Sequence, residues 1–172
     1  MALKTIDKKI VGTIDNLEDK LNGEIPVTRE ELLLLVSSWG RRLGFATKDS
    51  QNKDIYIGSC EAKECYNLSK LDTSKITNMS DVFIYSLFDG DISEWNTSNV
   101  TNMDYMFYQV TNFNSNIGNW DVSNVTTMES MFEYAEKFNQ NISTWDVSNV
   151  VNMEGMFRNA EKFNQPLNTW NT

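Results

Sequence analysis

Residues 117–138 read IGNWDVSNVTTMESMFEYAEKF, and the apolar positions of this run recur along the chain every 25 residues. The tryptophans lie at Trp95, Trp120, Trp145 and Trp170, and valine, methionine and phenylalanine positions keep the same spacing. A fixed period of this size indicates stacked units that share one core, because a single unit cannot bury its apolar face alone. The aromatic and methionine residues of the pattern are therefore expected to be core residues.

The pattern matches the leucine-rich template L-x-x-L-x-L-x-x-(N/C). Alternation at Trp120 and Val122 predicts a short strand, and the spacing Met128, Met131, Phe132, Ala135 predicts one or two turns of α- or 3₁₀-helix opposite it. We therefore predict an α/β solenoid, a right-handed leucine-rich-repeat-like coil of about four 25-residue repeats over residues 67–172.

Residues 1–66 lack the repeat and are predicted to form a helical N-terminal cap with a variable insertion. Thr28 and Glu31 have the spacing of a capping box, which predicts that a helix starts there and continues to Gly40. An earlier helical run is expected to end at Asn22–Gly23. Solenoids need such a cap, because their end units otherwise expose apolar surface.

The composition excludes several classes of function. A net charge of −9 and a pI near 4.5 oppose binding to nucleic acid, and the polar mean hydropathy of −0.45 opposes a membrane span. The chain has no histidine, so neither a histidine-based catalytic triad nor a histidine zinc site can form. We therefore expect no enzymatic activity, no cofactor and no metal site.

The two cysteines, Cys60 and Cys65, are too few for a structural zinc site, which takes four ligands. A local disulfide is expected in an oxidising compartment and a pair of free thiols in a reducing one. No export leader is visible at the N-terminus, so the sequence leaves open whether the protein stays in the cytoplasm or has lost its leader.

The phrases Asp121-Val-Ser-Asn-Val-Thr126 and Asp146-Val-Ser-Asn-Val150, together with Met-x-x-Met-Phe and Phe-Asn-Gln, resemble the BspA-like leucine-rich-repeat surface proteins, whose repeat is abundant in mycoplasma lipoproteins. The resemblance covers about residues 66–172. It implies a bacterial cell-surface or secreted protein of the adhesin type that binds a host or neighbouring-cell protein or glycan. The resemblance supplies no catalytic residues. An intracellular interaction or regulatory scaffold is the alternative.

Small polar residues recur at three further positions and would form outward rows if the predicted strand is correct. These rows have two interpretations: hydrogen bonds between successive coils, or a strip that binds a repetitive ligand. The candidate binding residues are Asn96, Ser98, Asn99, Asp121, Ser123, Asn124, Asp146, Ser148 and Asn149. The variable charges are expected to form a solvated convex face; they are Glu94, Glu133, Glu136, Lys137, Glu161 and Lys162.

The last repeat is predicted to expose apolar surface, which leaves two interpretations: the sequence is part of a longer array, or two copies associate end to end as a homodimer. The residues expected to take part are Met153, Met156, Phe157, Phe163 and Trp170. The sequence thus favours a binding module over an enzyme, since a repeat surface offers rows of side chains rather than the cleft that paired catalytic carboxylates need.

Overall fold

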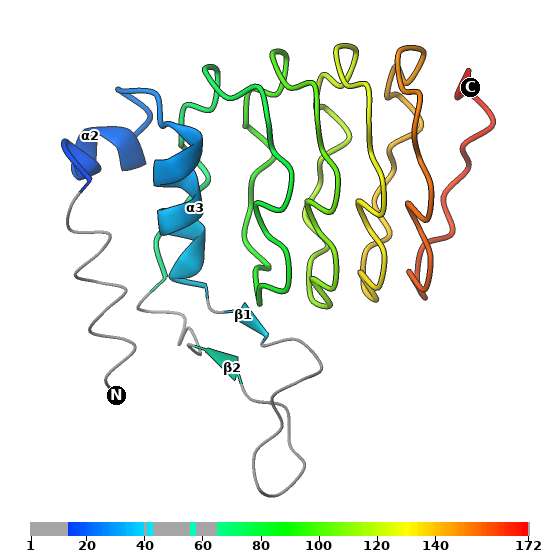
Figure 1. Cartoon of the computed structure of the whole chain (residues 1–172), viewed down its shortest axis with the longest axis horizontal. Helices are drawn as coiled ribbons and strands as arrows, with labels where there is room; N and C mark the ends of the chain where they lie inside the picture. The colour runs from blue at the N-terminus through cyan, green and yellow to red at the C-terminus, as the bar shows by residue number, and fades with distance from the viewer. Residues whose placement is uncertain (1–13, 40, 43–55, 58–64, 172) are drawn as a thin grey trace, which may run out of the picture.

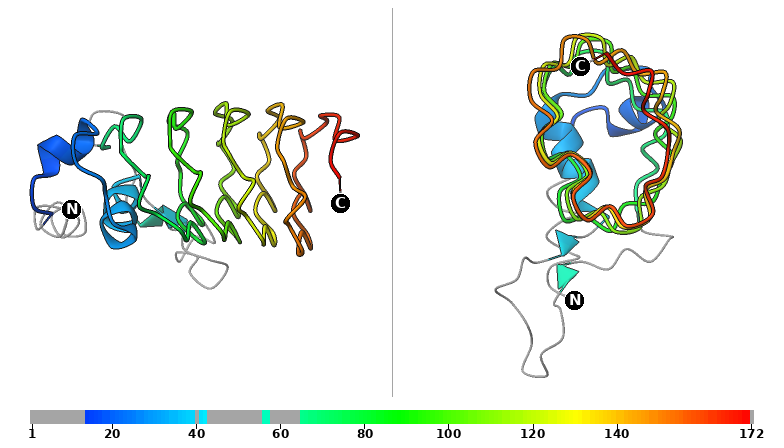
Figure 2. Two further views of the ribbon diagram at one scale, coloured as in Figure 1. Left: turned by 90° about the horizontal axis from the view of Figure 1, so that it is seen from above. Right: turned by 90° about the vertical axis from the view of Figure 1, so that its right-hand side faces the viewer.

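The computed structural model describes residues 14–39, 41–42, 56–57 and 65–171. From residue 65 onward the chain winds into successive coils that stack side by side along one axis (Figure 1). Seen along that axis, the coils superimpose on one oval outline (Figure 2). Helices α2 (Leu17–Leu21) and α3 (Arg29–Ser37) lie at the end of the stack where the first coil begins. Strands β1 (Arg41–Arg42) and β2 (Tyr56–Ile57) pair antiparallel.

Backbone hydrogen bonds join each coil to the next along one side of the stack. The N–H groups of Met79, Asp81, Phe83 and Tyr85 donate to carbonyls at residues 102, 104, 106 and 108, at 2.9–3.0 Å. The same pattern links residues 103–109 to 127–133 and residues 128–134 to 152–158. We call this set of bonds the ladder. All of its donors point from the earlier coil to the later one, and parallel bridges run beside it through Asn78, Asn102, Thr127 and Asn152.

The interior consists of columns in which equivalent side chains stack from coil to coil. In one column, Phe83, Phe107, Phe132 and Phe157 have ring centroids 5.3–5.7 Å apart and planes within 6° of parallel. All residues of the apolar pattern in the coil from 117 to 138 are buried, which confirms that they are core residues. This continuous packing buries each coil's apolar face against both neighbours.

The local structure of the coils differs from the expected strand and helix. Around Val122 the chain turns, because Asp121 Oδ1 accepts the Ser123 N–H at 3.0 Å and this bond competes with strand pairing. Over residues 128–135 the chain also forms turns, since Ser130 and Tyr134 have the left-handed φ values 49° and 58°, which interrupt a right-handed helix.

Left-handed residues occupy the same two positions in every coil. They are Asp81, Tyr105, Ser130 and Gly155 in one column, and Tyr85, Gln109, Tyr134 and Asn159 in the other. The ladder donors lie at alternate positions, and every second donor is left-handed. The backbone can therefore point successive donor amides at the next coil without forming a regular helix or strand. The leucine-rich-repeat class and the division at residues 66 and 67 remain predictions.

Helix α3 covers the first coil. The predicted capping box is confirmed, with Thr28 Oγ1 accepting the Glu31 N–H at 3.2 Å and Glu31 Oε2 accepting the Thr28 N–H at 3.0 Å. Arg29 Nη2 donates to the Ser80 carbonyl at 2.8 Å and thus satisfies an acceptor that interior coils satisfy through the ladder. The buried face of α3 carries leucine and valine side chains that join the common core.

Helix α2 ends where the sequence predicted, with Asn22 as its C-cap and Gly23 following at φ +78°. A Cβ at Gly23 would lie 2.3 Å from the Lys70 carbonyl oxygen, so the close approach of α2 to the first coil requires glycine. Among the described residues, no helix is long and apolar enough to cross a membrane.

Candidate binding site

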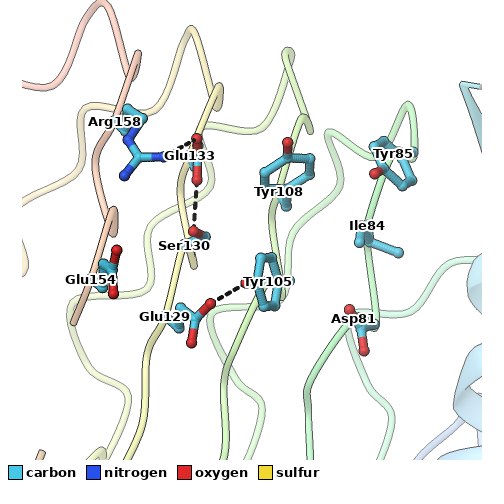
Figure 3. Close-up of a pocket in the computed structure, with 10 residues that line it drawn as sticks. All are labelled: Asp81, Ile84, Tyr85, Tyr105, Tyr108, Glu129, Ser130, Glu133, Glu154 and Arg158. Carbon is cyan, nitrogen blue, oxygen red and sulfur yellow. Dashed lines mark hydrogen bonds and ion pairs between the residues drawn. The ribbon is translucent and has the colours of Figure 1, made fainter. Parts of the chain in front are cut away.

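A cavity of about 470 Å³ lies on the ladder side of the stack (Figure 3). Its walls come from four successive coils and are polar and aromatic in character. In the repeat unit Met-x-x-Met-Phe-x-x, and in the related first coil, every lining residue occupies a variable x position. The lining residues are Asp81, Ile84, Tyr85, Tyr105, Tyr108, Glu129, Ser130, Glu133, Glu154 and Arg158.

Four tyrosines form an edge-to-face cluster in and beside this cavity. Tyr108 is the centre, with ring centroids 5.5 Å from Tyr85, 5.8 Å from Tyr105 and 6.0 Å from Tyr134, at interplanar angles of 88°, 61° and 78°. Such T-shaped pairs are one of the preferred aromatic geometries and stabilise the positions of the rings. We call Tyr85, Tyr105, Tyr108 and Tyr134 the tyrosine cluster.

Glu129 is held by two neutral donors from neighbouring coils. Tyr105 Oη donates to Glu129 Oε1, and Asn152 Nδ2 donates to Glu129 Oε2 at 3.0 Å. The hydrogen bond to Glu129, assisted by burial and by the charge of Glu129, raises the pKa of Tyr105 to about 12. Tyr105 therefore stays a hydrogen-bond donor, and the carboxylate of Glu129 is held without a positively charged partner.

Glu133 is 5% exposed, which corrects the expectation that it belongs to a solvated convex face. Its carboxylate accepts from Ser130 Oγ at 2.6 Å and from Arg158 Nη1 at 3.3 Å. The αL turn at Ser130 turns the chain so that residues 130 and 133 both face the cavity. Gly155 leaves room beside them, since a Cβ there would lie 3.1 Å from Ser130 Oγ.

The cavity has an excess of negative charge. Four carboxylates line it, from Asp81, Glu129, Glu133 and Glu154, whereas Arg158 supplies the one guanidinium. Burial raises the pKa of Tyr85, and the neighbouring Tyr108 and Asp81 raise it further. In the described part of the chain, no three acidic or cysteine side chains are grouped to hold a metal ion.

The structure brings the nine candidate residues of the sequence together in rows across successive coils, outside the cavity. One row is already used between coils, because the amides of Asn99, Asn124 and Asn149 donate to the carbonyls of residues 74, 98 and 123 at 2.7–2.8 Å. This row therefore forms hydrogen bonds between successive coils, which was one of the two interpretations of these residues.

The other two rows are paired with each other within each coil. Ser98 donates to Asn96, Ser123 to Asp121, and the N–H of Ser148 to Asp146. These bonds lower the pKa of Asp121 and of Asp146. Apart from half-buried Ser98 and Ser123, the nine residues are exposed, and their role in binding stays a prediction.

Residues 53–170 match the family model described as Mycoplasma protein of unknown function, DUF285. This chain belongs to the DUF285 family. The match spans more than half of the chain and includes all four coils that line the cavity. No curated protein and no solved structure matches this DUF285 chain.

The two remaining predicted sites of the DUF285 chain lie elsewhere. Cys60 is outside the described residues, and Cys65 is disulfide-bonded. Of the residues expected to self-associate, Met156 is buried, whereas Met153, Phe157, Phe163 and Trp170 are half-buried. Self-association through these residues stays a prediction.

Sequence reasoning missed the cavity of this DUF285 chain because it followed the residues that recur. Most residues of the cavity change from coil to coil: Ile84, Tyr108, Glu133 and Arg158 occupy one repeat position, whereas Glu129 and Glu154 share another. The available signal was that variability itself: large, chemically diverse side chains gather at the x positions of Met-x-x-Met-Phe-x-x, although the framework around them is constant.

Proposed function

We propose that this DUF285 chain is a non-catalytic binding module of the adhesin type, which holds a protein partner on its ladder side. The observation that carries the proposal is the cavity with its tyrosine cluster. Tyrosine and arginine are enriched among the residues that dominate binding energy at protein interfaces, and tyrosine offers a large contact area for little loss of side-chain entropy. Membership of the BspA-like leucine-rich-repeat surface proteins, and a location on the cell surface, are part of this proposal.

The scaffold beneath the tyrosine cluster supports a binding role. Ladder bonds at 2.8–3.0 Å fix the backbone of residues 103–109 and 128–134 on both sides, so the side chains project from positioned coils. Binding residues on a rigid support lose less entropy when a partner docks. The rows of asparagine and serine have fewer hydrogen-bond donors available for a ligand, because their donors already bond within a coil or between coils.

Two of the four carboxylates of the cavity, Glu129 and Glu133, support binding rather than catalysis. Glu129 accepts from Tyr105 and Asn152, and Glu133 accepts from Ser130 and Arg158, so each of these side chains is engaged at both oxygens. A general acid or base has to exchange a proton with a substrate within hydrogen-bond reach. Because each of these four oxygens already accepts a hydrogen bond, the two side chains form part of the cavity wall.

A combined protein and glycan array, probed with the full chain, tests the proposal. We expect protein hits that are lost for Tyr108→Ala and kept for Ser148→Arg, which changes the exposed row and leaves the cavity intact. The reverse pattern would place the site on the rows, and hits confined to glycans would overturn the proposal of a protein partner.

Protease treatment of intact cells tests the proposed location, since a surface protein is cleaved and an intracellular scaffold is protected.

A further inference from the structure

Three carboxylates of the cavity have no basic partner, and Asp81 and Glu154 differ from Glu129 in that the tyrosine and asparagine donors do not hold them. The ion pairs among the described residues are Lys20–Glu31 and Arg158–Glu133, and neither involves Asp81 or Glu154. Asp81 is half-buried and Glu154 is exposed, and they lie toward opposite ends of the cavity with Tyr105 between them (Figure 3). The cavity therefore attracts positive charge at both of these ends, within a chain whose net charge is −9.

The tyrosine cluster adds a second attraction of the same sign. The face of an aromatic ring carries negative charge density and attracts a lysine ammonium or an arginine guanidinium within about 6 Å of the ring centroid. Tyr85, Tyr105 and Tyr108 all line the cavity, and Tyr85 and Tyr105 each lie at a steep angle to Tyr108, so the ring faces do not all point in one direction. A group entering the cavity thus meets ring faces as well as ring edges.

The size of the cavity suits a side chain together with its flanking backbone. Its volume of about 470 Å³ lies in the lower half of the range of roughly 300–1,000 Å³ that is typical of ligand pockets. A long flexible side chain with a charged end can lay its methylene groups against Ile84 and the tyrosine rings while its charge reaches a carboxylate.

We infer that the cavity receives a lysine or arginine side chain of the protein partner, between the tyrosine cluster and the carboxylates of Asp81 and Glu154. This inference rests on the proposed function and specifies the chemistry of the partner at the same site. Arg158 does not fill this role, because its guanidinium is paired with Glu133 and its side chain is 57% exposed. The partner's charge therefore complements the carboxylates that the chain leaves unpaired.

The test uses the full chain and a synthetic lysine-containing octapeptide, compared with the same peptide in which every lysine is acetylated. Binding is followed by the shifts of backbone amide NMR signals. We expect the lysine peptide to shift the signals of Tyr105, Tyr108 and Glu129, and the acetylated peptide to leave them unchanged. Tyr108→Leu should weaken binding about three- to thirtyfold, the range that corresponds to one cation–π contact.

A matched pair of charge variants separates this site from general attraction to an acidic protein. The variant Asp81→Asn/Glu154→Gln removes two charges from the cavity, and Glu136→Gln/Glu161→Gln removes two exposed charges outside it. Asparagine tolerates the φ of 60° at position 81, so the first variant is expected to keep the fold. We expect the cavity variant to weaken binding more than the control does.

Equal weakening by both charge variants would show that net charge alone attracts the peptide and would overturn the inference. Equal binding of the acetylated peptide would also overturn it. Neither outcome touches the proposed function, which fails separately if Tyr108→Ala leaves the protein partner bound. If Tyr108→Leu lowers the melting temperature, the comparison of the two charge variants still decides the question.

Discussion

A single tryptophan position shows what one residue contributes to each coil. The indole of Trp120 is buried, donates from Nε1 to the Ile92 carbonyl at 3.1 Å and stacks on Trp95 at 6.4 Å with planes 3° apart. The equivalent indole N–H donates in the same way at Trp95, Trp145 and Trp170. Each tryptophan therefore joins its coil to the previous one through packing and a hydrogen bond together.

Replacing Trp120 with alanine should lower the free energy of unfolding by about 3–5 kcal/mol, because the substitution leaves a cavity and an unpaired carbonyl. The half-buried Trp170 serves as the matched control, and Trp170→Ala should cost less. Urea denaturation of the two variants measures both values. An equal cost at the two positions would contradict the packing described here.

The Tyr105–Glu129 pair predicts a pH dependence in the alkaline range. Because the pKa of Tyr105 is raised from 10.0 to about 12 in the folded chain, its neutral form is favoured by folding. The stabilisation is complete below the unfolded pKa and is lost as the pH rises through the folded one, between about 10 and 12. The pKa of Tyr85 is also raised, so ultraviolet titration of Tyr105→Phe against the unchanged chain is needed, and it should show the loss of a component that ionises near pH 12. An unchanged titration curve would refute the pair.

At the residue scale the inward positions were predictable from the sequence and the cavity was not. Met128, Met131 and Phe132 recur with the period and are buried as expected. The burial of Glu133 depends on Ser130 in its own coil and Arg158 in the next, and a single carboxylate in the sequence gives no sign of either contact. Contacts between coils at variable positions depend on the three-dimensional register, which spacing alone does not supply.

At the element scale, the start of helix α3 was easier to predict from the sequence than the local structure of the coils. A capping box is a local signal, since both hydrogen bonds join residues three positions apart. The ladder is not local: each donor bonds to a carbonyl about a coil away, and the left-handed residues that make this possible are not glycines, with the exception of Gly155. Apolar spacing therefore suggested a helix where the chain forms turns.

Removing the cap of α3 tests how the helix supports the stack. Thr28→Ala removes one of the two capping bonds and should cost about 0.5–2 kcal/mol of stability. Arg29→Leu should leave the Ser80 carbonyl without this donor and increase hydrogen exchange in residues 79–85. Thermal melts and exchange measured by mass spectrometry give both results, and unchanged exchange in the first coil would contradict the capping role of Arg29.

At the scale of the whole molecule, stability is a property of neighbouring coils. Phe132 stacks on Phe107 at 5.4 Å and on Phe157 at 5.7 Å, so one ring serves three coils. In a linear stack, stability is approximately the sum of unit and nearest-neighbour contributions. A defect in one coil is therefore expected to loosen the adjacent coils first.

Phe132→Ala should accordingly increase amide hydrogen exchange in residues 103–109 and 128–134 more than in helix α3. The donors at those positions belong to the ladder that joins the affected coils. Exchange resolved by peptide and mass spectrometry measures the difference. A uniform increase over α3 and all coils would instead show that the described part of the chain unfolds as one unit.

The one-way direction of the ladder has a consequence for biosynthesis. Helix α3 leaves the ribosome before any coil. Its Arg29 can therefore donate to the Ser80 carbonyl as soon as the first coil emerges. Each later coil then brings carbonyl acceptors to amides that are already in place on the coil made before it. Because chains emerge from the N-terminus onward, we expect the coils to fold one after another during translation, each new coil packing on the folded coil before it.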